Sequence, residues 1–198
     1  MLCYDENIEK PVYMQTFIDQ RTGGISNMKK LTVLLFALAL LCVGALAEST
    51  VPALTPIQIA PVSGFEPVAL YCGPTQGFYR HEDQTLDLTA PFVCFGQYDC
   101  WTMAAQGTPE AFGPVGWIEG GLFDDQSMSM LSFDDAFSAM IEEDAAVTNA
   151  PMNADGAWDA VLPRGTQVTV LAAFGDFLYV QTEINGMPAR VFVPEKAF

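Results

Sequence analysis

The sequence has few positively charged residues. It contains 8 Lys and Arg against 24 Asp and Glu, and its formal net charge is −16. Proteins bind nucleic-acid phosphates and anionic membrane surfaces chiefly through Lys and Arg. The composition therefore argues against both of these partners, and it favours neutral or cationic ones.

Histidine is nearly absent as well. The one imidazole, His81, stands in the polar run RHEDQ. A dyad of Cys72 with His81 is conceivable, but the sequence offers no third group to orient it. We therefore expect His81 to be an exposed loop residue and the protein not to be an enzyme.

Metal-binding spacings are lacking too. Acidic residues occur as short pairs, such as Asp134 with Asp135, and NADGAWD at residues 153–159 resembles a calcium loop only faintly. It has neither the alternating Asp positions nor the final Glu that hold Ca²⁺ in such loops. We expect solvated acidic loops and no cofactor, with structural calcium as the weaker alternative.

One long apolar run is present, near the N-terminus. It covers residues 31–47, follows two lysines and ends in the small-residue sequence ALA. This is the arrangement of a secretory signal peptide, and the run is shorter than the roughly 20 residues of a membrane span. We predict a signal helix at residues 28–47 and no stable membrane insertion after its cleavage, with a retained anchor as the alternative. Residues 1–27 fit no targeting pattern, so we expect an untranslated or disordered leader.

The part that follows the predicted cleavage site begins with a proline-rich segment and has few cysteines. Residues 48–65 read as an extended linker. Three cysteines follow it, which in an oxidising compartment predicts one disulfide and one thiol. Cys94 and Cys100 lie at equal offsets from Gln97 in an apparent hairpin turn, which would place them opposite each other on paired strands. We predict a Cys94–Cys100 disulfide, with Cys72–Cys100 as the competing pair.

Short apolar runs dominate the remaining chain. Examples are residues 68–71, 92–95, 168–171 and 189–193, and Gly, Pro, Asn and Asp separate them. Strands of this length between turn residues predict an all-β fold, as a small barrel or a sandwich.

The chain also contains an internal repeat. FVCFGQYDCWTMA from Phe92 aligns without a gap on VTVLAAFGDFLYV from Val168, an offset of 76 residues. The triplet GWI at residues 116–118 then aligns with VFV at 191–193 after one extra residue. Identity is low, but the order of strand, turn, aromatic residue and strand recurs, which indicates two copies of one β module.

These residues carry a resemblance to a known family. The second copy reads LPRGTQVTVLAAFGDFLYVQTEINGMPARVFVP, and the first opens with YCGPTQGFYR at residues 71–80 and closes with GWI. Both are similar to bacterial SH3-like (SH3b) domains of secreted proteins from gut-dwelling Gram-positive bacteria. The resemblance implies two tandem small SH3-like β-barrels, with module one at residues 66–123, and linking strands and module two at residues 124–198.

One segment allows two interpretations. SFDDAFSAMIEEDAA, from Ser132, has helical spacing of its apolar residues, and Ser132 and Asp135 are spaced as a capping box. Local reasoning therefore favours a helix at residues 133–146. The resemblance favours strands at residues 139–148 instead.

Aromatic side chains are the best candidates for a binding site. Flat aromatic faces with acids nearby can hold an extended peptide, although two small barrels also need aromatic cores. The candidate residues are Tyr71, Tyr79, Trp101, Trp117, Phe177, Tyr179 and Phe192. We expect a secreted, non-catalytic binding protein whose ligand is a cell-wall peptide or an extracellular protein. The alternative is a structural or inhibitory protein whose acidic surface docks a basic secreted partner.

Overall fold

The computed structural model describes residues 51–120, 128–153 and 157–198, without the side chains of residues 81, 82 and 157–159. The unit Ser49–Phe198 is compact by itself. The predicted leader and signal peptide lie outside the described residues. Within the described ranges, no helix is long and apolar enough to cross a membrane.

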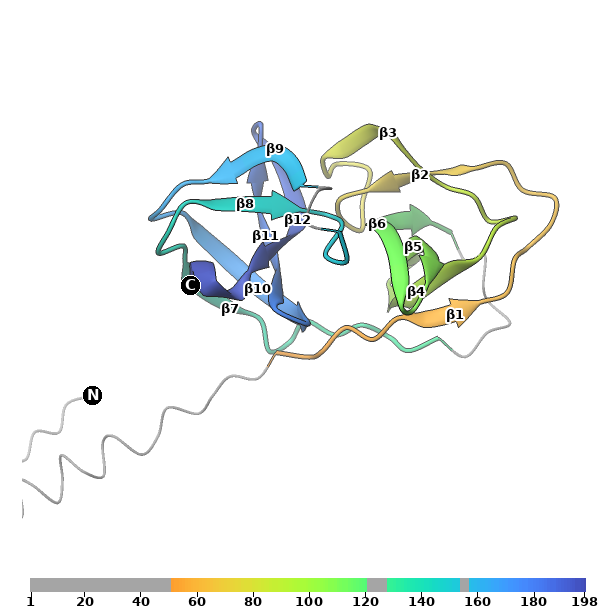
Figure 1. Cartoon of the computed structure of the whole chain (residues 1–198), viewed down its shortest axis with the longest axis horizontal. Coiled ribbons are helices and arrows are strands. Elements are labelled where there is room, and N and C mark those ends of the chain that lie inside the picture. Colours follow the sequence, from red (N-terminus) through yellow and green to blue (C-terminus); the bar gives the residue numbers. More distant parts are fainter. Residues whose placement is uncertain (1–50, 121–127, 154–156) are drawn as a thin grey trace, which may run out of the picture. The chain divides into compact units, whose positions relative to one another are not determined.

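The described chain is all-β, as the sequence predicts, and its strands form two antiparallel six-stranded sheets (Figure 1). The first sheet contains β1 (Ile57–Ile59), β2 (Val68–Tyr71), β3 (Arg80–Leu86), β4 (Phe92–Tyr98), β5 (Trp101–Thr108) and β6 (Ala111–Glu119). The second contains β7 (Phe137–Met140), β8 (Ala145–Thr148), β9 (Ala157–Leu162), β10 (Gln167–Phe174), β11 (Phe177–Ile184) and β12 (Met187–Pro194). A 3₁₀ turn, η2 (Glu195–Ala197), follows β12.

The two sheets have the same topology, which confirms that the chain contains two copies of one β module. The strand orders are β1-β4-β5-β6-β2-β3 and β7-β10-β11-β12-β8-β9, so each strand has its counterpart six places later. The offset of 76 also holds in the first hairpin, because Asp99 (φ 58°) and its counterpart Gly175 (φ 55°) both occupy the left-handed region. Within the described residues the ladders end at β1 and β3, and at β7 and β9.

The extra residue of the first copy forms a β-bulge. Ala105 pairs with Val115 but Gly107 pairs with Phe112, so β6 has one residue more than β5 between these pairs. The equivalent ladder, from Phe177 paired with Pro194 to Ile184 paired with Met187, is regular. A bulge of this kind admits one insertion without changing the face on which later side chains lie. Trp117 therefore keeps the position that Phe192 has in the second copy.

The segment expected to be a linker is part of the first sheet. Ile57, Gln58 and Ile59 form β1 and pair antiparallel with β4. An edge strand tolerates flanking prolines, since it has a row of N–H groups that no neighbour needs. The buried side chains of Ile59 and Leu54 anchor the segment to the core.

Residues 139–148 contain the end of one strand and the whole of the next, as the resemblance predicts, and the local helix interpretation is wrong. Phe137 to Met140 form β7 with alternating burial, and residues 145–148 form β8. The helical spacing is real, but pairing of β7 with β10 satisfies the backbone and buries Ile141. Tertiary pairing outweighs a local helix signal worth only tenths of a kcal/mol per residue.

The predicted Cys94–Cys100 disulfide is wrong, because the hairpin turns later than expected. Tyr98 pairs with Trp101, so the two turn residues are Asp99 and Cys100, and Cys94 lies opposite Ala104. Cys94 is buried, whereas Cys100 is exposed at the turn, and both are free thiols. Gly96, which suggested a turn at Gln97, instead lies at a bulge where a Cβ atom would meet the Ser129 carbonyl oxygen at 2.6 Å.

The two copies share part of their core. One buried cluster lies within the first sheet and includes Phe92 and Ile118. A second cluster combines first-copy residues such as Trp117 with Tyr179 and Phe192 of the second copy. Burial of Trp117, Tyr179 and Phe192 therefore involves residues of both sheets.

Backbone hydrogen bonds between the copies are reciprocal. The N–H of Arg190 in β12 donates to the Cys72 carbonyl at 2.6 Å, and the N–H of Val115 in β6 donates to the Asn149 carbonyl at 2.7 Å. Tyr71 pairs with Trp117 in the first sheet, and Thr148 pairs with Phe192 at the equivalent place in the second. Counting along the strands from these pairs, Cys72 corresponds to Asn149. In the same way, Val115 corresponds to Arg190.

The segments that precede each sheet repeat this reciprocity. Ala53 forms a parallel bridge with Ala173 of the second copy, and Met130 forms one with Gln97 of the first. Ala173 and Gln97 are again 76 residues apart. The two copies are thus joined by matched pairs of contacts, in the manner of the two subunits of a symmetric dimer.

Candidate functional site

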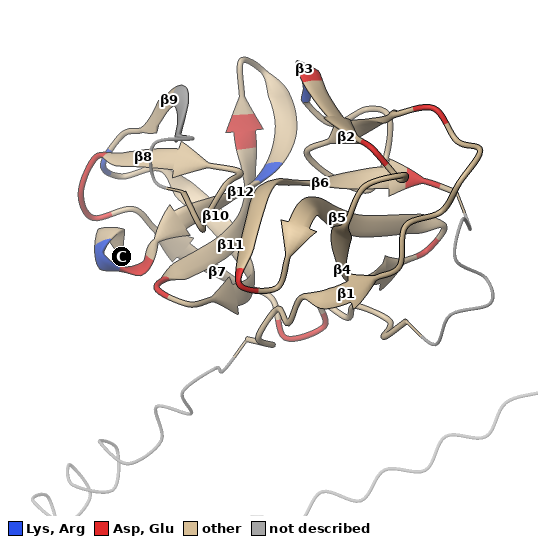
Figure 2. Ribbon diagram, turned by 45° about the vertical axis from the view of Figure 1, so that its right-hand side comes forward, with Lys and Arg blue, Asp and Glu red and all other residues tan. Residues whose placement is uncertain are grey.

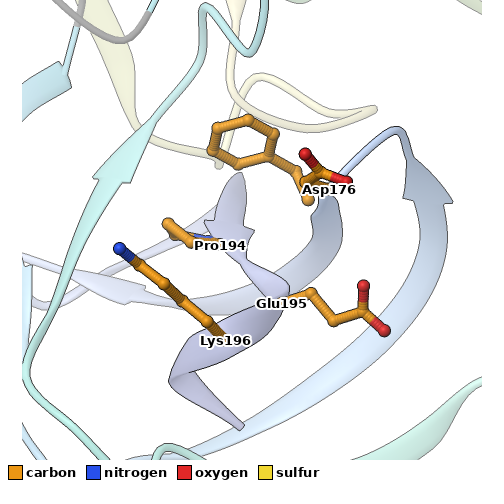
Figure 3. A pocket seen from close by; sticks show the side chains of 5 residues that line it. Asp176, Pro194, Glu195 and Lys196 are labelled. Atoms are coloured by element: carbon orange, nitrogen blue, oxygen red, sulfur yellow. The ribbon is translucent and has the colours of Figure 1, made fainter.

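An open cavity lies beside Phe177, one of the predicted binding residues. Its volume is about 670 Å³, and it is lined by Asp176, Phe177, Pro194, Glu195 and Lys196 (Figure 3). The β10–β11 turn supplies the first two residues, and the end of β12 with η2 supplies the others. The N–H of Glu195 donates to the Asp176 carbonyl at 2.9 Å, which fixes the two sides of the cavity to each other.

Local sequence explains why this corner is open. Gly175 adopts φ 55°, which lets a two-residue turn place Asp176 directly before Phe177. Pro194 pairs with Phe177 and ends β12, since it has no N–H to continue the ladder. The chain then turns into η2 instead of covering the Phe177 ring, which stays half-buried.

Charges of both signs surround the apolar floor of the cavity. In Figure 3 the carboxylates of Asp176 and Glu195 lie on one side of Pro194 and the ammonium of Lys196 on the other. An apolar surface with separated charges suits a peptide, whose amines and carboxylates alternate with its side chains. Figure 2 shows acidic residues on both copies and few basic ones, so Lys196 is an uncommon charge on this surface.

The equivalent corner of the first copy is filled. Trp101, the counterpart of Phe177, is buried and makes an edge-to-face contact with Tyr71 at 5.4 Å between ring centroids. The strand registers place Thr148 where the first copy has Tyr71. A threonine presents no ring to Phe177, so the second copy leaves its aromatic residue accessible.

A second, smaller cavity of about 330 Å³ lies between residues 52–57 and 129–135, beside Phe95. Its walls are the two segments that cross between the copies. Exposed Ile57 and Met130 flank it, but no charged group other than Asp135 lines it. Its polar groups are mainly hydroxyls, and it has fewer charged groups than the cavity at Phe177.

The other predicted aromatic residues are placed mostly in the core. Trp101, Trp117, Tyr179 and Phe192 are buried. The indole N–H of Trp117 donates to the Tyr179 hydroxyl at 2.7 Å. These four side chains have no surface to offer a ligand in this conformation. Tyr71 and Tyr79 are half-buried, and they pack against the shared core and the second-copy core, respectively.

Sequence reasoning missed a box of aromatic rings around Arg190. The guanidinium carbon lies 5.5 Å from the ring centres of Phe78 and Tyr98, 5.7 Å from Trp117 and 4.9 Å from Phe133. The four rings come from separate parts of the chain, so no local spacing could have revealed them. Contacts of this length are cation–π interactions.

Burial and neighbouring hydroxyls act in opposite directions on Arg190. Desolvation lowers the pKa of its guanidinium, while Tyr179 and Tyr98 raise that pKa. The same environment raises the pKa of the fully enclosed Tyr179 hydroxyl, chiefly through desolvation. A guanidinium keeps its charge under such perturbation, because its intrinsic pKa is far above neutrality.

Metal-ligating groups do not come together in the described part of the chain. There, no three His, Cys, Asp or Glu side chains are placed to hold a metal ion. The prediction that His81 lies in a loop is wrong, because it is part of β3. The exposure of its side chain stays a prediction, since that side chain lies outside the described residues.

The class defined by this geometry is an all-β protein of two topologically identical sheets with one open aromatic corner. No known family model, curated protein or solved structure matches the chain.

Proposed function

We propose that this chain is a secreted, non-catalytic SH3-like binding protein and that the cavity beside Phe177 holds an extended peptide. The observation that carries the proposal is the pairing of an accessible aromatic ring with a proline, Phe177 opposite Pro194, above a cavity of about 670 Å³. Aromatic surfaces of this kind bind extended segments, which have little conformational entropy left to lose.

The charges at the cavity narrow the class of ligand. The Asp176 and Glu195 carboxylates suit amino groups, and the Lys196 ammonium suits one carboxylate. A polyanion such as a phosphate polymer would be repelled by the net charge of −16. The ligand is therefore a peptide of the cell wall or a segment of an extracellular protein. The SH3-like barrels and the signal peptide at residues 28–47 belong to this proposal.

A wall-binding assay tests the proposal directly. The chain from Glu48 to Phe198 is incubated with purified peptidoglycan, and the retained fraction is measured with and without Phe177→Ala. We expect peptidoglycan to retain the wild-type chain. The affinity of the variant should be about tenfold lower, because removing one aromatic side chain from the centre of a binding site typically has an effect of this size. Phe65→Ala is the matched control, because Phe65 is 43% exposed and lies outside the cavity.

The outcomes separate the two sources of ligand. Retention by peptidoglycan that needs Phe177 supports the wall peptide, and equal retention of both variants removes the cavity from the proposal. Absence of wall retention, with capture of a secreted protein through Phe177, selects the extracellular segment. Mass spectrometry of the exported chain should give an N-terminus at Glu48. A peptide from residues 1–27 in the precursor would show that the leader is translated.

A second function rests on the net charge of −16 and on the acidic residues that Figure 2 marks on both copies. If the protein instead docks a basic partner, capture weakens steeply as salt is raised from 0.05 to about 0.5 M, because screening shortens the range of surface charges. Capture in that case does not depend on Phe177.

A further inference from the structure

Arg190 is an unusual cation for this protein. From Glu48 onward the sequence has only four of the eight Lys and Arg residues but twenty of the 24 Asp and Glu residues. With so many carboxylates available, a partly buried arginine is expected to pair with one. Within the described residues, Arg190 instead has aromatic rings on its sides and no ion pair with a carboxylate.

The hydrogen-bond capacity of this guanidinium is mostly unused. Its Nε donates to the Gln181 side-chain oxygen at 3.1 Å. Its Nη1 atom is buried and has no hydrogen-bond partner. Leaving a buried charged donor without an acceptor is unfavourable, and native structures rarely retain such a group without an ion, water or ligand to complete it.

The cation–π contacts offset only part of this cost. A ring attracts the charge as a whole, but it is a weaker hydrogen-bond acceptor than a carboxylate. The N–H edge of a guanidinium is directed in its own plane, where a carboxylate can accept two parallel hydrogen bonds. Among the described residues, the buried Nη1 donor therefore has no anionic counterpart.

One wall of the box lies at the surface. Tyr98 is 37% exposed, and it stands next to the β4–β5 turn, beside Phe133 at a centroid distance of 5.4 Å. Phe78, Phe133 and Arg190 are half-buried. A small group could reach the covered Nη1 atom if the Tyr98 ring rotated away from the guanidinium.

We propose that the aromatic box around Arg190 binds the carboxylate of a peptide, with the guanidinium edge as donor and Phe78, Tyr98 and Phe133 as apolar walls. The site is separate from the cavity at Phe177, because Arg190 stands four residues before Pro194 on β12 and pairs with Gln181. Its ligand adds an ion pair that Arg190 does not form with any acidic residue the structure describes.

The proposal can be tested by NMR spectroscopy of the Arg190 side chain in the folded protein. The chain from Glu48 to Phe198 is labelled with ¹⁵N, and the Nε–Hε signal that disappears in Arg190→Lys is assigned to Arg190. N-acetylalanine is then titrated against its amide, which has the same shape without the charge. We expect a saturable shift of the Arg190 signal and a change in tryptophan fluorescence with the acid, and binding at least tenfold weaker with the amide.

Variants separate this site from general attraction of anions. Arg164→Gln removes an exposed arginine, and we expect unchanged binding. Arg190→Lys keeps the charge but loses the planar edge, and we expect at least tenfold weaker binding in a variant that remains folded by amide spectra. Phe177→Ala leaves carboxylate binding unchanged, so the failure of this proposal is distinguishable from the failure of the peptide cavity.

Three results would overturn the proposal. One is an Arg190 signal that does not move at any carboxylate concentration, which leaves the box a purely structural clamp. The second is an equal response to acid and amide. The third is an equal response of the Arg164 signal, or equal binding of inorganic phosphate, either of which indicates non-selective anion attraction.

Discussion

Trp117 and Tyr179 meet through a buried hydrogen bond of 2.7 Å between the indole N–H and the phenol hydroxyl. Trp117 belongs to β6 and Tyr179 to β11, so this bond joins the two copies. Both side chains lie in the cluster that the copies share. The bond satisfies two polar groups that could not be buried otherwise, and its removal can be measured.

Replacing Trp117 with Phe retains a ring but removes the donor. We expect the free energy of unfolding to fall by about 1–3 kcal/mol, measured by urea denaturation, because the Tyr179 hydroxyl loses its partner. Tyr179→Phe and the double variant complete a cycle with a coupling of about 0.5–1.5 kcal/mol. Phe65→Leu, at an exposed position, should change stability by less than about 0.5 kcal/mol. Strict additivity of the two single variants would show that the bond contributes nothing.

The shared core predicts that the two copies unfold together. Calorimetry of the chain from Glu48 onward should give one transition whose calorimetric and van't Hoff enthalpies agree. The amide protons of Val115 and Arg190 should exchange at similarly slow rates, because each is released only when the copies separate. Two resolved transitions, or fast exchange at one of these amides, would contradict the reciprocal interface.

The bulge in the β5–β6 ladder depends on Gly107. Its φ is 130°, and a Cβ atom there would lie 2.3 Å from the Ala111 carbonyl oxygen. We expect Gly107→Ala to cost more than about 2 kcal/mol, since strained backbone and a backbone clash combine. Gly186→Ala is the matched control, because Gly186 has φ 76° but no atom near the added carbon. The control should cost about 1 kcal/mol, and similar costs at the two sites would exclude the clash.

The two hairpin cysteines should differ in reactivity. Burial raises the pKa of the Cys94 thiol from 9.0 to about 12, whereas Cys100 is exposed at the turn. We expect a maleimide at pH 8 to label Cys100 within minutes and Cys94 only after unfolding. Intact-mass analysis that finds the two residues joined by a disulfide would contradict the strand register.

Ionisation of the Cys94 thiol should make the free energy of unfolding depend on pH. The folded state keeps the Cys94 proton up to pH about 12 while the unfolded chain loses it near pH 9.0. The contribution to stability is complete below pH 9 and declines as the pH rises toward 12, by up to about 1.4 kcal/mol per pH unit. Urea titrations of Cys94→Ala should show a shallower decline over this range than wild type, and identical slopes would exclude the burial of the thiol.

The sequence predicted those features that depend on local pattern. Alternating apolar runs predicted the strands, and the offset between Phe92 and Val168 predicted the repeat together with its one extra residue. The position of the first turn could not be predicted, because Gly96 and Asp99, three residues apart, are both residue types that favour turns. Contact with Ser129, remote in sequence, decides that Gly96 serves a bulge.

The candidate site was predicted only in part. Phe177 was identified through the repeat and lines a cavity, but the role of its neighbour Lys196 depends on the turn of the chain after Pro194. The Arg190 box could not be predicted, because its rings stand in four different segments and come together only through pairing between the copies. Similar apolar patterns in both copies also gave no sign that Trp101 would be covered and Phe177 would not.

The position of Arg190 near the end of the chain has a consequence for synthesis. A chain emerges with its N-terminus first, and early segments fold with whatever partners have already appeared. The Cys72 carbonyl and the rings of Phe78 and Trp117 must wait for β12, the last strand. Until then the first copy presents uncovered aromatic surface, so a ribosome that stops before residue 187 would release a chain prone to aggregate and quickly degraded.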